Sequence, residues 1–257
     1  MTGNGTMEPR VALITGGASG IGLAAAERLR AIGWKIAIAD IGEAALARAR
    51  ESFGSETDVR IAKLDVTDEA AVEREIAAIE EDLGPIAGVV NSAGISADKH
   101  TMDTPVDLFR RILDVNVVGT FIVARAAARQ MQKRERGAIV NVASVAGLRG
   151  SKGRSAYGSS KGAVIVLTQV MANDLARYGI RVNAIAPGPV DTPMVQAMHT
   201  DEDRRTWTHF IPMRRYGRPE EIAPTISFLL DDAQSSYLTG EIVAVDGGFA
   251  GAGIMAD

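Results

Sequence analysis

The sequence predicts an α/β fold, a doubly wound parallel sheet of about seven strands with helices on both faces. Short continuous apolar runs alternate with amphipathic stretches almost from end to end of the 257 residues. Unbroken apolar runs are typical of strands buried on both faces, and helices between them are typical of parallel crossovers. A glycine-rich turn after the first apolar run supports the same fold class, because such turns join strand to helix in these sheets.

Each element follows from its own pattern. The apolar runs predict strands at 11–14, 36–39, 59–64, 89–90, 138–143, 181–185 and 241–245. The amphipathic stretches predict helices at 23–32, 44–53, 69–83, 107–134, 155–178 and 220–230. Two of these helices are followed by stop signals, Gly84-Pro85 and Gly137.

The chain shows no internal shift in composition. We therefore expect one domain over residues 9–257, after a disordered lead-in at 1–8. The long stretch from 187 to 218 has no periodic pattern and is expected to be irregular. A loop of that length in a compact domain is usually functional, so it predicts a substrate lid at about 190–216.

The composition excludes several classes of function. The chain has 28 Lys and Arg against 32 Asp and Glu, a net charge of −4, and no basic run, so nucleic acid is not an expected partner. No apolar stretch is long enough to span a bilayer, and the first residues lack the order of a signal peptide. Cysteine is absent and the three histidines form no ligand motif, so no metal site is expected. The lack of cysteine fits a cytoplasmic protein.

Residues 15–22, Thr-Gly-Gly-Ala-Ser-Gly-Ile-Gly, follow a predicted strand and open a predicted helix. Glycines there let the backbone approach a pyrophosphate, and the helix N-terminus offers N–H groups and a positive dipole to that anion. A turn that only packs the helix would use glycines as well. The cofactor-binding residues expected from this turn are Gly16, Ser19, Gly20, Ile21 and Gly22.

Polar residues end the next strands of the predicted sheet. Asp40 ends the second strand, where a carboxylate accepts hydrogen bonds from ribose hydroxyls and repels a 2′-phosphate, so NAD is the expected cofactor. Asp65 and Asn91 end the third and fourth strands. Each of the three could equally cap a turn or a helix. Together they place polar groups along one sheet edge, where open α/β sheets bind ligands.

Tyr157 and Lys161 lie at positions i and i+4 of the helix predicted at 155–178 and share one face of it. A neighbouring ammonium stabilises a phenolate and lowers the tyrosine pKa, which makes Tyr157 a candidate general acid–base. Ser144 follows a predicted strand, and its hydroxyl could hold a substrate carbonyl oxygen. Asn116 lies inside a predicted helix, where asparagine is unfavourable, and this indicates a functional position.

In order and spacing, these motifs resemble the compact single-domain branch of the short-chain dehydrogenase/reductase family, which has a Rossmann-type fold. The resemblance covers about residues 9–249. It rests on T-G-x-x-x-G-I-G at 15–22, Asp65, N-x-A-G at 91–94, Asn116, Ser144, Y-x-x-x-K at 157–161 and P-G-P-V-x-T at 187–192. Ser92 departs from the family, which usually has Asn there.

The resemblance implies a role for each matching residue. Tyr157 would move the proton, Lys161 would lower its pKa and bind the nicotinamide ribose, and Ser144 would orient the substrate oxygen. Asn116 would hold a water that connects Lys161 to solvent. Asp65 would bind the adenine amine. The cofactor contacts implied beyond the glycine turn and Asp40 are Asp65, Val66, Asn91, Ala93, Gly94, Tyr157, Lys161, Pro187, Gly188, Val190 and Thr192.

The expected function is an NAD-dependent oxidoreductase that moves a hydride between the cofactor and a secondary alcohol or ketone. A sugar, polyol or similar hydroxy compound is the expected substrate. Reduction of 3-oxoacyl thioesters is the alternative; family members with that activity usually use NADPH and carry a basic residue in the glycine turn, where this chain has Ser19. A non-catalytic NAD-binding regulator is the alternative from another class. The G-x-S-x-G pattern at 158–162 lacks the preceding strand of a hydrolase.

Two further expectations concern the substrate and assembly. The loop between Ser144 and Tyr157 must pass the substrate, so Ala146, Arg149 and Lys152 join them as candidate substrate contacts, although most loop cations are only solvated. Small residues on the helices at 107–134 and 155–178 permit close helix approach. Relatives in the family pair through these helices, which predicts a homotetramer.

Overall fold

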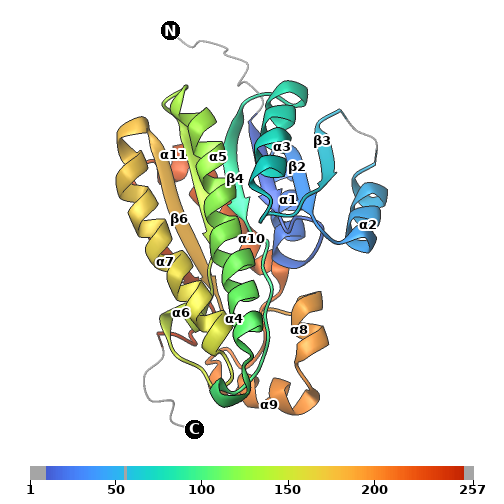
Figure 1. The fold of residues 1–257 in the computed structure, drawn as a ribbon, viewed down its shortest axis with the longest axis vertical. Coiled ribbons are helices and arrows are strands. Elements are labelled where there is room, and N and C mark those ends of the chain that lie inside the picture. Colours follow the sequence, from blue (N-terminus) through green and yellow to red (C-terminus); the bar gives the residue numbers. More distant parts are fainter. Residues whose placement is uncertain (1–9, 55–56, 252–257) are drawn as a thin grey trace.

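A parallel sheet of seven strands forms the centre of the part that this computed structural model describes, residues 10–54 and 57–251 (Figure 1). The strands are β1 Val11–Thr15, β2 Lys35–Asp40, β3 Val59–Lys63, β4 Ile86–Asn91, β5 Gly137–Val142, β6 Ile180–Pro187 and β7 Ile242–Val245. Their order is β3-β2-β1-β4-β5-β6-β7, and every neighbouring pair is parallel. The predicted fold class is confirmed, whereas the lead-in predicted at 1–8 lies outside the described residues.

Helices cover both faces of this sheet. One face carries α3 (Glu69–Asp82), α5 (Thr120–Gln132) and α7 (Ser155–Leu175), and the other carries α1 (Gly20–Ala31), α2 (Glu43–Phe53) and α10 (Pro219–Leu230). Side chains of β1 alternate between the two cores, with Leu13 in one and Ile14 in the other. Because both cores are apolar, central strands such as β1 contain an unbroken apolar run.

The strand order reverses between β1 and β4, and this reversal positions the site. Thr15, the last residue of β1, pairs with Ala39 of β2 on one side and with Asn91 of β4 on the other. The carboxyl ends of these strands therefore meet at one edge. Chains leave that edge toward opposite faces, which opens a crevice for ligands.

The prediction of one long helix at 107–134 is wrong in one respect, because a π-helical segment interrupts the helix. α4 (Val106–Leu113) and α5 are separated by η2 (Asp114–Gly119), a π-helical segment. Asn116 lies in this segment, where its Oδ1 accepts the Ile95 backbone N–H at 2.8 Å and its Nδ2 donates to the Ile95 carbonyl at 3.0 Å. A π segment shifts the helical phase locally, and a 3.6-residue periodicity does not reveal that shift.

The stretch at 187–218, expected to be irregular, contains two helices. They are α8 (Pro193–Met198) and α9 (Asp201–Phe210), which extend past the carboxyl edge of the sheet in Figure 1. α9 begins with a capping box, in which Thr200 Oγ1 accepts the Asp203 N–H and the Asp203 carboxylate accepts the Thr200 N–H. α9 has no buried residue among those described, and Trp207 and Phe210 are its only apolar residues, so an apolar pattern did not predict it.

The remaining short elements are η1 Thr101–Asp103, α6 Val145–Leu148, η3 Ala176–Tyr178 and α11 Asp232–Ser235. Across the described residues, no helix has the length and apolar character needed to cross a membrane. The same residues contain no group of His, Cys, Asp and Glu side chains placed to hold a metal ion.

Candidate active site

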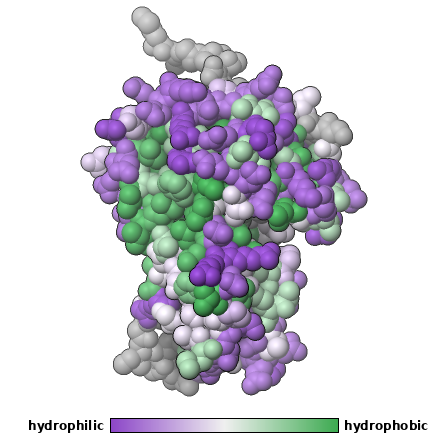
Figure 2. All heavy atoms as spheres, viewed as in Figure 1, coloured by the Kyte–Doolittle hydropathy of each residue, from purple (hydrophilic) through white to green (hydrophobic). Residues whose placement is uncertain are grey.

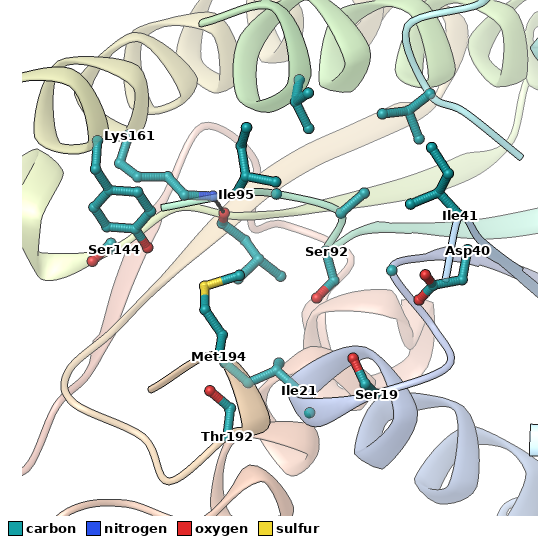
Figure 3. A pocket seen from close by; sticks show the side chains of 18 of the residues that line it. Ser19, Ile21, Asp40, Ile41, Ser92, Ile95, Ser144, Lys161, Thr192 and Met194 are labelled. Carbon is teal, nitrogen blue, oxygen red and sulfur yellow. Dashed lines mark hydrogen bonds between the residues drawn. The ribbon is translucent and has the colours of Figure 1, made fainter. Parts of the chain in front are cut away.

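A cavity of about 510 Å³ opens along the carboxyl edge of the sheet. In Figure 3, Asp40 and Ile41 lie at one end of it, Ser144 and Lys161 lie at the other, and Ser92 lies between them. Most of the residues that the sequence predicted for the site come together in its wall. They are Gly16, Ser19, Gly20, Ile21, Asp40, Asp65, Val66, Ala93, Gly94, Ser144, Tyr157, Lys161, Pro187, Gly188 and Thr192.

The glycine turn is shaped by close backbone contacts. Gly16 has a φ of +62°, and a Cβ there would lie 2.7 Å from the backbone nitrogen of Ala93. Gly20 has a φ of +53°, and its Cβ would lie 3.2 Å from Cγ2 of Thr192. Side chains at these positions would be strained and would push the turn away from β4 and from the segment after β6. Ser19 is the N-cap residue of α1, yet among the described contacts its side chain makes no capping bond.

Two carboxylates face the cavity from the ends of β2 and β3. Asp40 accepts the backbone N–H groups of Ala18 at 3.2 Å and of Gly42 at 3.0 Å, which fixes its orientation. Asp65 accepts the backbone N–H of Thr67 at 2.9 Å and its hydroxyl at 2.7 Å. Both side chains are held by local bonds and line the cavity.

These features fit a nicotinamide dinucleotide. The backbone at Gly16 and Gly20 approaches the cavity with no side chain in the way, and the first N–H groups of α1 are not capped by Ser19. Asp40 stands where a ribose hydroxyl can donate to it. The uncapped N-terminus of α1 and the carboxylate of Asp40 at one end of the cavity together match two parts of such a cofactor, its pyrophosphate and its ribose.

Four predicted residues lie behind the cavity wall rather than in it: Gly22, Asn91, Asn116 and Val190. A Cβ on Gly22 would lie 2.3 Å from the carbonyl oxygen of Gly16, so this glycine lets α1 pack against the turn. The Val190 carbonyl accepts the backbone N–H of Thr192 at 2.8 Å. Both residues shape the site through a neighbour that lines it.

Ser144 and Tyr157 meet at the end of the cavity opposite Asp40. Ser144 is the N-cap of α6, and its Oγ accepts the Ala146 N–H at 3.1 Å. Its hydroxyl proton is thereby left for another acceptor, and the Ser144 side chain hydrogen-bonds to Tyr157. Tyr157 enters from the first turn of α7. A carbonyl oxygen placed between the two hydroxyls can receive a hydrogen bond from each.

Lys161 is buried one turn further along α7. Its Nζ donates to the carbonyl of Val142 at 2.7 Å and lies 5.8 Å from the ring centre of Tyr157. Burial lowers the pKa of Lys161 to about 8. A Cβ on Gly94 would lie 3.6 Å from this Nζ and 3.1 Å from Oδ1 of Asn116, so Gly94 borders both side chains.

The sequence predicts a lowered pKa for Tyr157, whereas the net shift in the structure is upward. Burial raises the pKa of Tyr157 above its ordinary value. Hydrogen bonding from Ser144 and the nearby charge of Arg154 act in the opposite direction. Tyr157 is therefore a neutral phenol at neutral pH, a state suited to giving a proton away.

The loop between Ser144 and Tyr157 contributes partly other residues to the cavities than the sequence predicted. Ala146 lines a second, smaller cavity beside Ser144 and Tyr157. Arg149 and Lys152 are exposed, and neither belongs to the described lining of either cavity. The loop cation that does line the second cavity is Arg154.

Sequence reasoning missed several lining residues. Ile41, Ile95, Arg111, Asp114 and Met194 all line the large cavity. Ile41 follows Asp40 directly, so its neighbour is the signal that could have found it. Met194 comes from α8, which the sequence did not predict. By contrast, His199 and Trp207 belong to the lid that the sequence predicts at about 190–216, and both line the smaller cavity.

Comparison with known proteins agrees with this geometry. A family model described as "Enoyl-(Acyl carrier protein) reductase" matches residues 16–250. The chain belongs to the short-chain dehydrogenase/reductase family. The resemblance stated from the motifs is thereby confirmed.

Several relatives cover nearly the whole chain. The 3-oxoacyl-acyl-carrier-protein reductase MabA of Mycobacterium tuberculosis is 37% identical over 93% of this chain and 92% of its own length. Acetoacetyl-CoA reductase of Synechocystis is 38% identical over 94% and 96%. The crystal structure of levodione reductase superposes with a TM-score of 0.88 at 37% identity, covering 95% of this chain and 98% of that chain. The curated levodione reductase of Leifsonia aquatica is likewise 37% identical, over 93% of each chain.

Family membership and the assembled site make this protein an oxidoreductase of CH–OH groups and their ketones that uses a nicotinamide cofactor. The expected enzyme class is confirmed. These relatives are reductases of oxo compounds, so they give no support to the expectation of a sugar or polyol substrate.

Proposed function

We propose that this short-chain dehydrogenase/reductase interconverts a small ketone and its secondary alcohol, with NAD(H) as the hydride carrier. The observation that carries the proposal is one continuous cavity with Ser144 and Lys161 at one end and Asp40 at the other. Tyr157 lines the same cavity and is hydrogen-bonded to Ser144. Ser144, Tyr157 and Lys161 would border the end of a dinucleotide that carries the hydride, and Asp40 would bind its adenosine ribose.

The side chains at the catalytic end of the cavity have separate roles in the proton transfer. When bound, the nicotinamide supplies or accepts the hydride. In the reductive direction, Tyr157 gives its phenolic proton to the carbonyl oxygen, and the Ser144 hydroxyl holds that oxygen in place. The ammonium of Lys161, close to the tyrosine ring, stabilises the phenolate that remains. Asn116 and Lys161 both lie beside Gly94, and we assign Asn116 a role in replacing the proton through Lys161.

NAD(H) rather than NADP(H) is the proposed cofactor because of Asp40. Two backbone N–H groups fix its carboxylate toward the cavity, where a 2′-phosphate would meet a like charge. The described lining beside it, Ser19 and Ile41, offers no cation to compensate. Arg111 lines the cavity from α4 and is a cation that could pair with such a phosphate.

The proposed cofactor can be tested by comparing kcat/KM for NADH and NADPH with a fixed ketone. We expect NADH to be preferred by at least about 100-fold, the factor that about 2.7 kcal/mol provides. Asp40→Ala should reduce that preference to about tenfold or less by improving NADPH binding. Asp107→Ala removes an exposed carboxylate of α4 and should leave the ratio unchanged. Equal use of both cofactors by the unmodified protein would contradict the proposal.

The substrate proposal follows the names of the relatives. Those names denote oxo compounds: a 3-oxoacyl group, an acetoacetyl thioester and a dione. A small oxo compound is therefore a better first substrate than a sugar or polyol. Reduction of 3-oxoacyl thioesters remains the second candidate, favoured by these names. A panel of acetoacetyl-CoA, a small keto ester, a cyclic dione and a polyol, read as NADH consumed or formed, separates these substrates.

A further inference from the structure

The second cavity, of about 80 Å³, continues from the catalytic end of the large one, since Ser144 and Tyr157 line both. Met198, His199 and Trp207 close it from the lid. A substrate whose reacting carbonyl lies at Ser144 and Tyr157 places its neighbouring atoms in this cavity. Its lining therefore decides which substituents are accepted beside the reacting carbon.

Arg154 is the charged side chain in the described lining of this cavity, and it is only 10% exposed. Its Nε pairs with Asp98 Oδ1 at 2.8 Å, its Nη1 donates to Ser96 Oγ at 3.0 Å, and its Nη2 donates to His199 at 3.1 Å. The guanidinium lies 5.5 Å from the ring centre of Tyr157. These bonds use three of the five guanidinium N–H groups, so two remain for a ligand as far as the described residues show.

The protonation of His199 follows from this contact. Arginine only donates, so Nε2 of His199 must accept from it. The ring proton is then on Nδ1 and is donated to the Tyr216 hydroxyl at 2.9 Å. Burial, followed by the charge of Arg154, lowers the pKa of His199, which keeps the ring neutral. His199 also stacks on Trp207, with ring centres 5.9 Å apart.

The cavity therefore offers N–H donors but almost no net charge. The positive charge of Arg154 is matched by Asp98, and His199 adds none. The rest of the wall is mainly apolar, from Val145, Met194, Val195, Met198 and Trp207. Such a site favours a neutral acceptor oxygen, because a carboxylate would lose its hydration without meeting an unmatched cation.

We propose that Arg154 binds a second, neutral carbonyl oxygen of the substrate, so that the enzyme selects diketones, keto esters or keto thioesters over simple ketones and over keto acids. This inference rests on the proposed function, because it assigns the second cavity to the ketone that Tyr157 protonates. It replaces Arg149 and Lys152 with Arg154 as the substrate-contacting cation of the loop before α7. Asp98 acts as the residue that sets the charge of this subsite.

Three ketones test the proposal: ethyl acetoacetate, acetoacetate and 2-pentanone. They present a neutral second carbonyl, a carboxylate and no second oxygen. We expect the unmodified enzyme to have a kcat/KM for the keto ester at least about tenfold above that for each of the other two. Arg154→Met should reduce the advantage over 2-pentanone to about twofold, mainly through a higher KM for the ester. Arg110→Met, which removes an exposed guanidinium from α4, is the matched control and should keep the advantage.

Asp98→Asn provides a second, milder variant that retains the arginine. Removal of the matching carboxylate leaves the guanidinium charge unbalanced, so acetoacetate should gain about tenfold relative to ethyl acetoacetate. Arg154→Lys retains charge without the planar fork and should restore only part of the ester preference. If Arg154→Met fails to fold, the results for Asp98→Asn and Arg154→Lys still decide whether Arg154 binds the second carbonyl oxygen.

The outcomes separate this inference from the proposed function. If no ketone is reduced with NADH or NADPH, the proposed function fails. If ketones are reduced but Arg154→Met lowers kcat for the ester and for 2-pentanone equally and shifts the pH profile, Arg154 acts only through Tyr157 and the subsite is rejected. Preference of the unmodified enzyme for acetoacetate over its ester would also overturn the inference.

Discussion

Tyr157 and Lys161 lie one helical turn apart, and burial shifts their pKa values in opposite directions. Burial disfavours the charged form of each, so it raises the pKa of the phenol and lowers that of the ammonium to about 8. At neutral pH both groups carry their proton. The protein is therefore prepared to reduce a ketone, whereas alcohol oxidation first requires the phenol to lose its proton.

This arrangement predicts different pH dependences for the two directions. Ketone reduction needs the neutral phenol and should vary less than about twofold between pH 6 and 7.5. Alcohol oxidation needs the phenolate, so log kcat/KM should rise by about one per pH unit from neutral pH. The rise should flatten above about pH 8, where Lys161 loses the charge that stabilises the phenolate. An oxidative rate independent of pH between 6 and 8 would contradict this assignment.

Tyr157→Phe gives a direct test of the proton donor. The variant keeps the ring that Arg154 and Lys161 both approach but has no hydroxyl, so kcat for ketone reduction should fall by about 10²–10⁴. Binding of NADH, measured by fluorescence titration, should remain within about threefold. A variant that retains a tenth or more of the unmodified kcat would show that another group supplies the proton.

Local sequence does not reveal which of the three loop cations, Arg149, Lys152 or Arg154, lines the cavity. All three cations lie in one loop without periodicity, so nothing in the sequence tells which one turns inward. Arg154 does so because Asp98 and His199, distant in the chain, bind its guanidinium. By contrast, Tyr157 and Lys161 were predictable because a helix fixes their relative position.

At the level of elements, the strands were predicted well and the helices less evenly. Buried strands have an unmistakable apolar run, so strand predictions erred mainly at their ends, as where β4 begins at Ile86 rather than at 89. The π segment η2 and the helices α8 and α9 were missed. η2 is held by contacts of Asn116 with Ile95 and Ser160, and α9 by its own cap, neither of which is an amphipathic pattern.

A chain of buried polar side chains anchors α7 to the sheet. Asn91 of β4 donates to Asn141 of β5 at 2.9 Å, and Asn141 donates to Thr168 of α7 at 2.9 Å. The Thr168 hydroxyl in turn donates to the carbonyl of Val164 at 2.8 Å. Since α7 also carries Tyr157 and Lys161, this chain ties the catalytic helix to the strands that form the cavity.

Thr168→Val should therefore destabilise the protein more than its small change in shape suggests. The substitution leaves the Asn141 amide without its partner in a fully buried place, which costs about 1–3 kcal/mol in the free energy of unfolding. Thr168→Ser keeps the hydroxyl and should lose about 1 kcal/mol, the value of one buried methyl group. Urea unfolding measures both. If Thr168→Val is as stable as the unmodified protein, the chain of hydrogen bonds does not stabilise the fold.

At the scale of the molecule, the surface of α5 and α7 is the place to look for an interface between chains, and only some of its small residues are accessible there. Ala124, Ala127 and Ala172 are buried against the sheet within one chain, so they do not form a contact between chains. The same two helices and η2 instead expose larger apolar side chains, Val118, Phe121, Val166 and Val170. Figure 2 shows an apolar area on this face of the molecule.

We therefore keep the prediction of a homotetramer and assign one of its interfaces to this apolar face. Val166 and Val170 are 57% and 50% exposed, and burial of such side chains in an interface is favourable by about 25 cal/mol per Å². The double variant Val166→Glu/Val170→Glu would place charges in that interface and should yield a smaller species in light scattering at micromolar concentration. Tyr237→Glu, at a fully exposed aromatic residue outside these helices, should keep the mass of the unmodified protein. A monomeric unmodified protein, or a double variant with unchanged mass, would contradict the assignment.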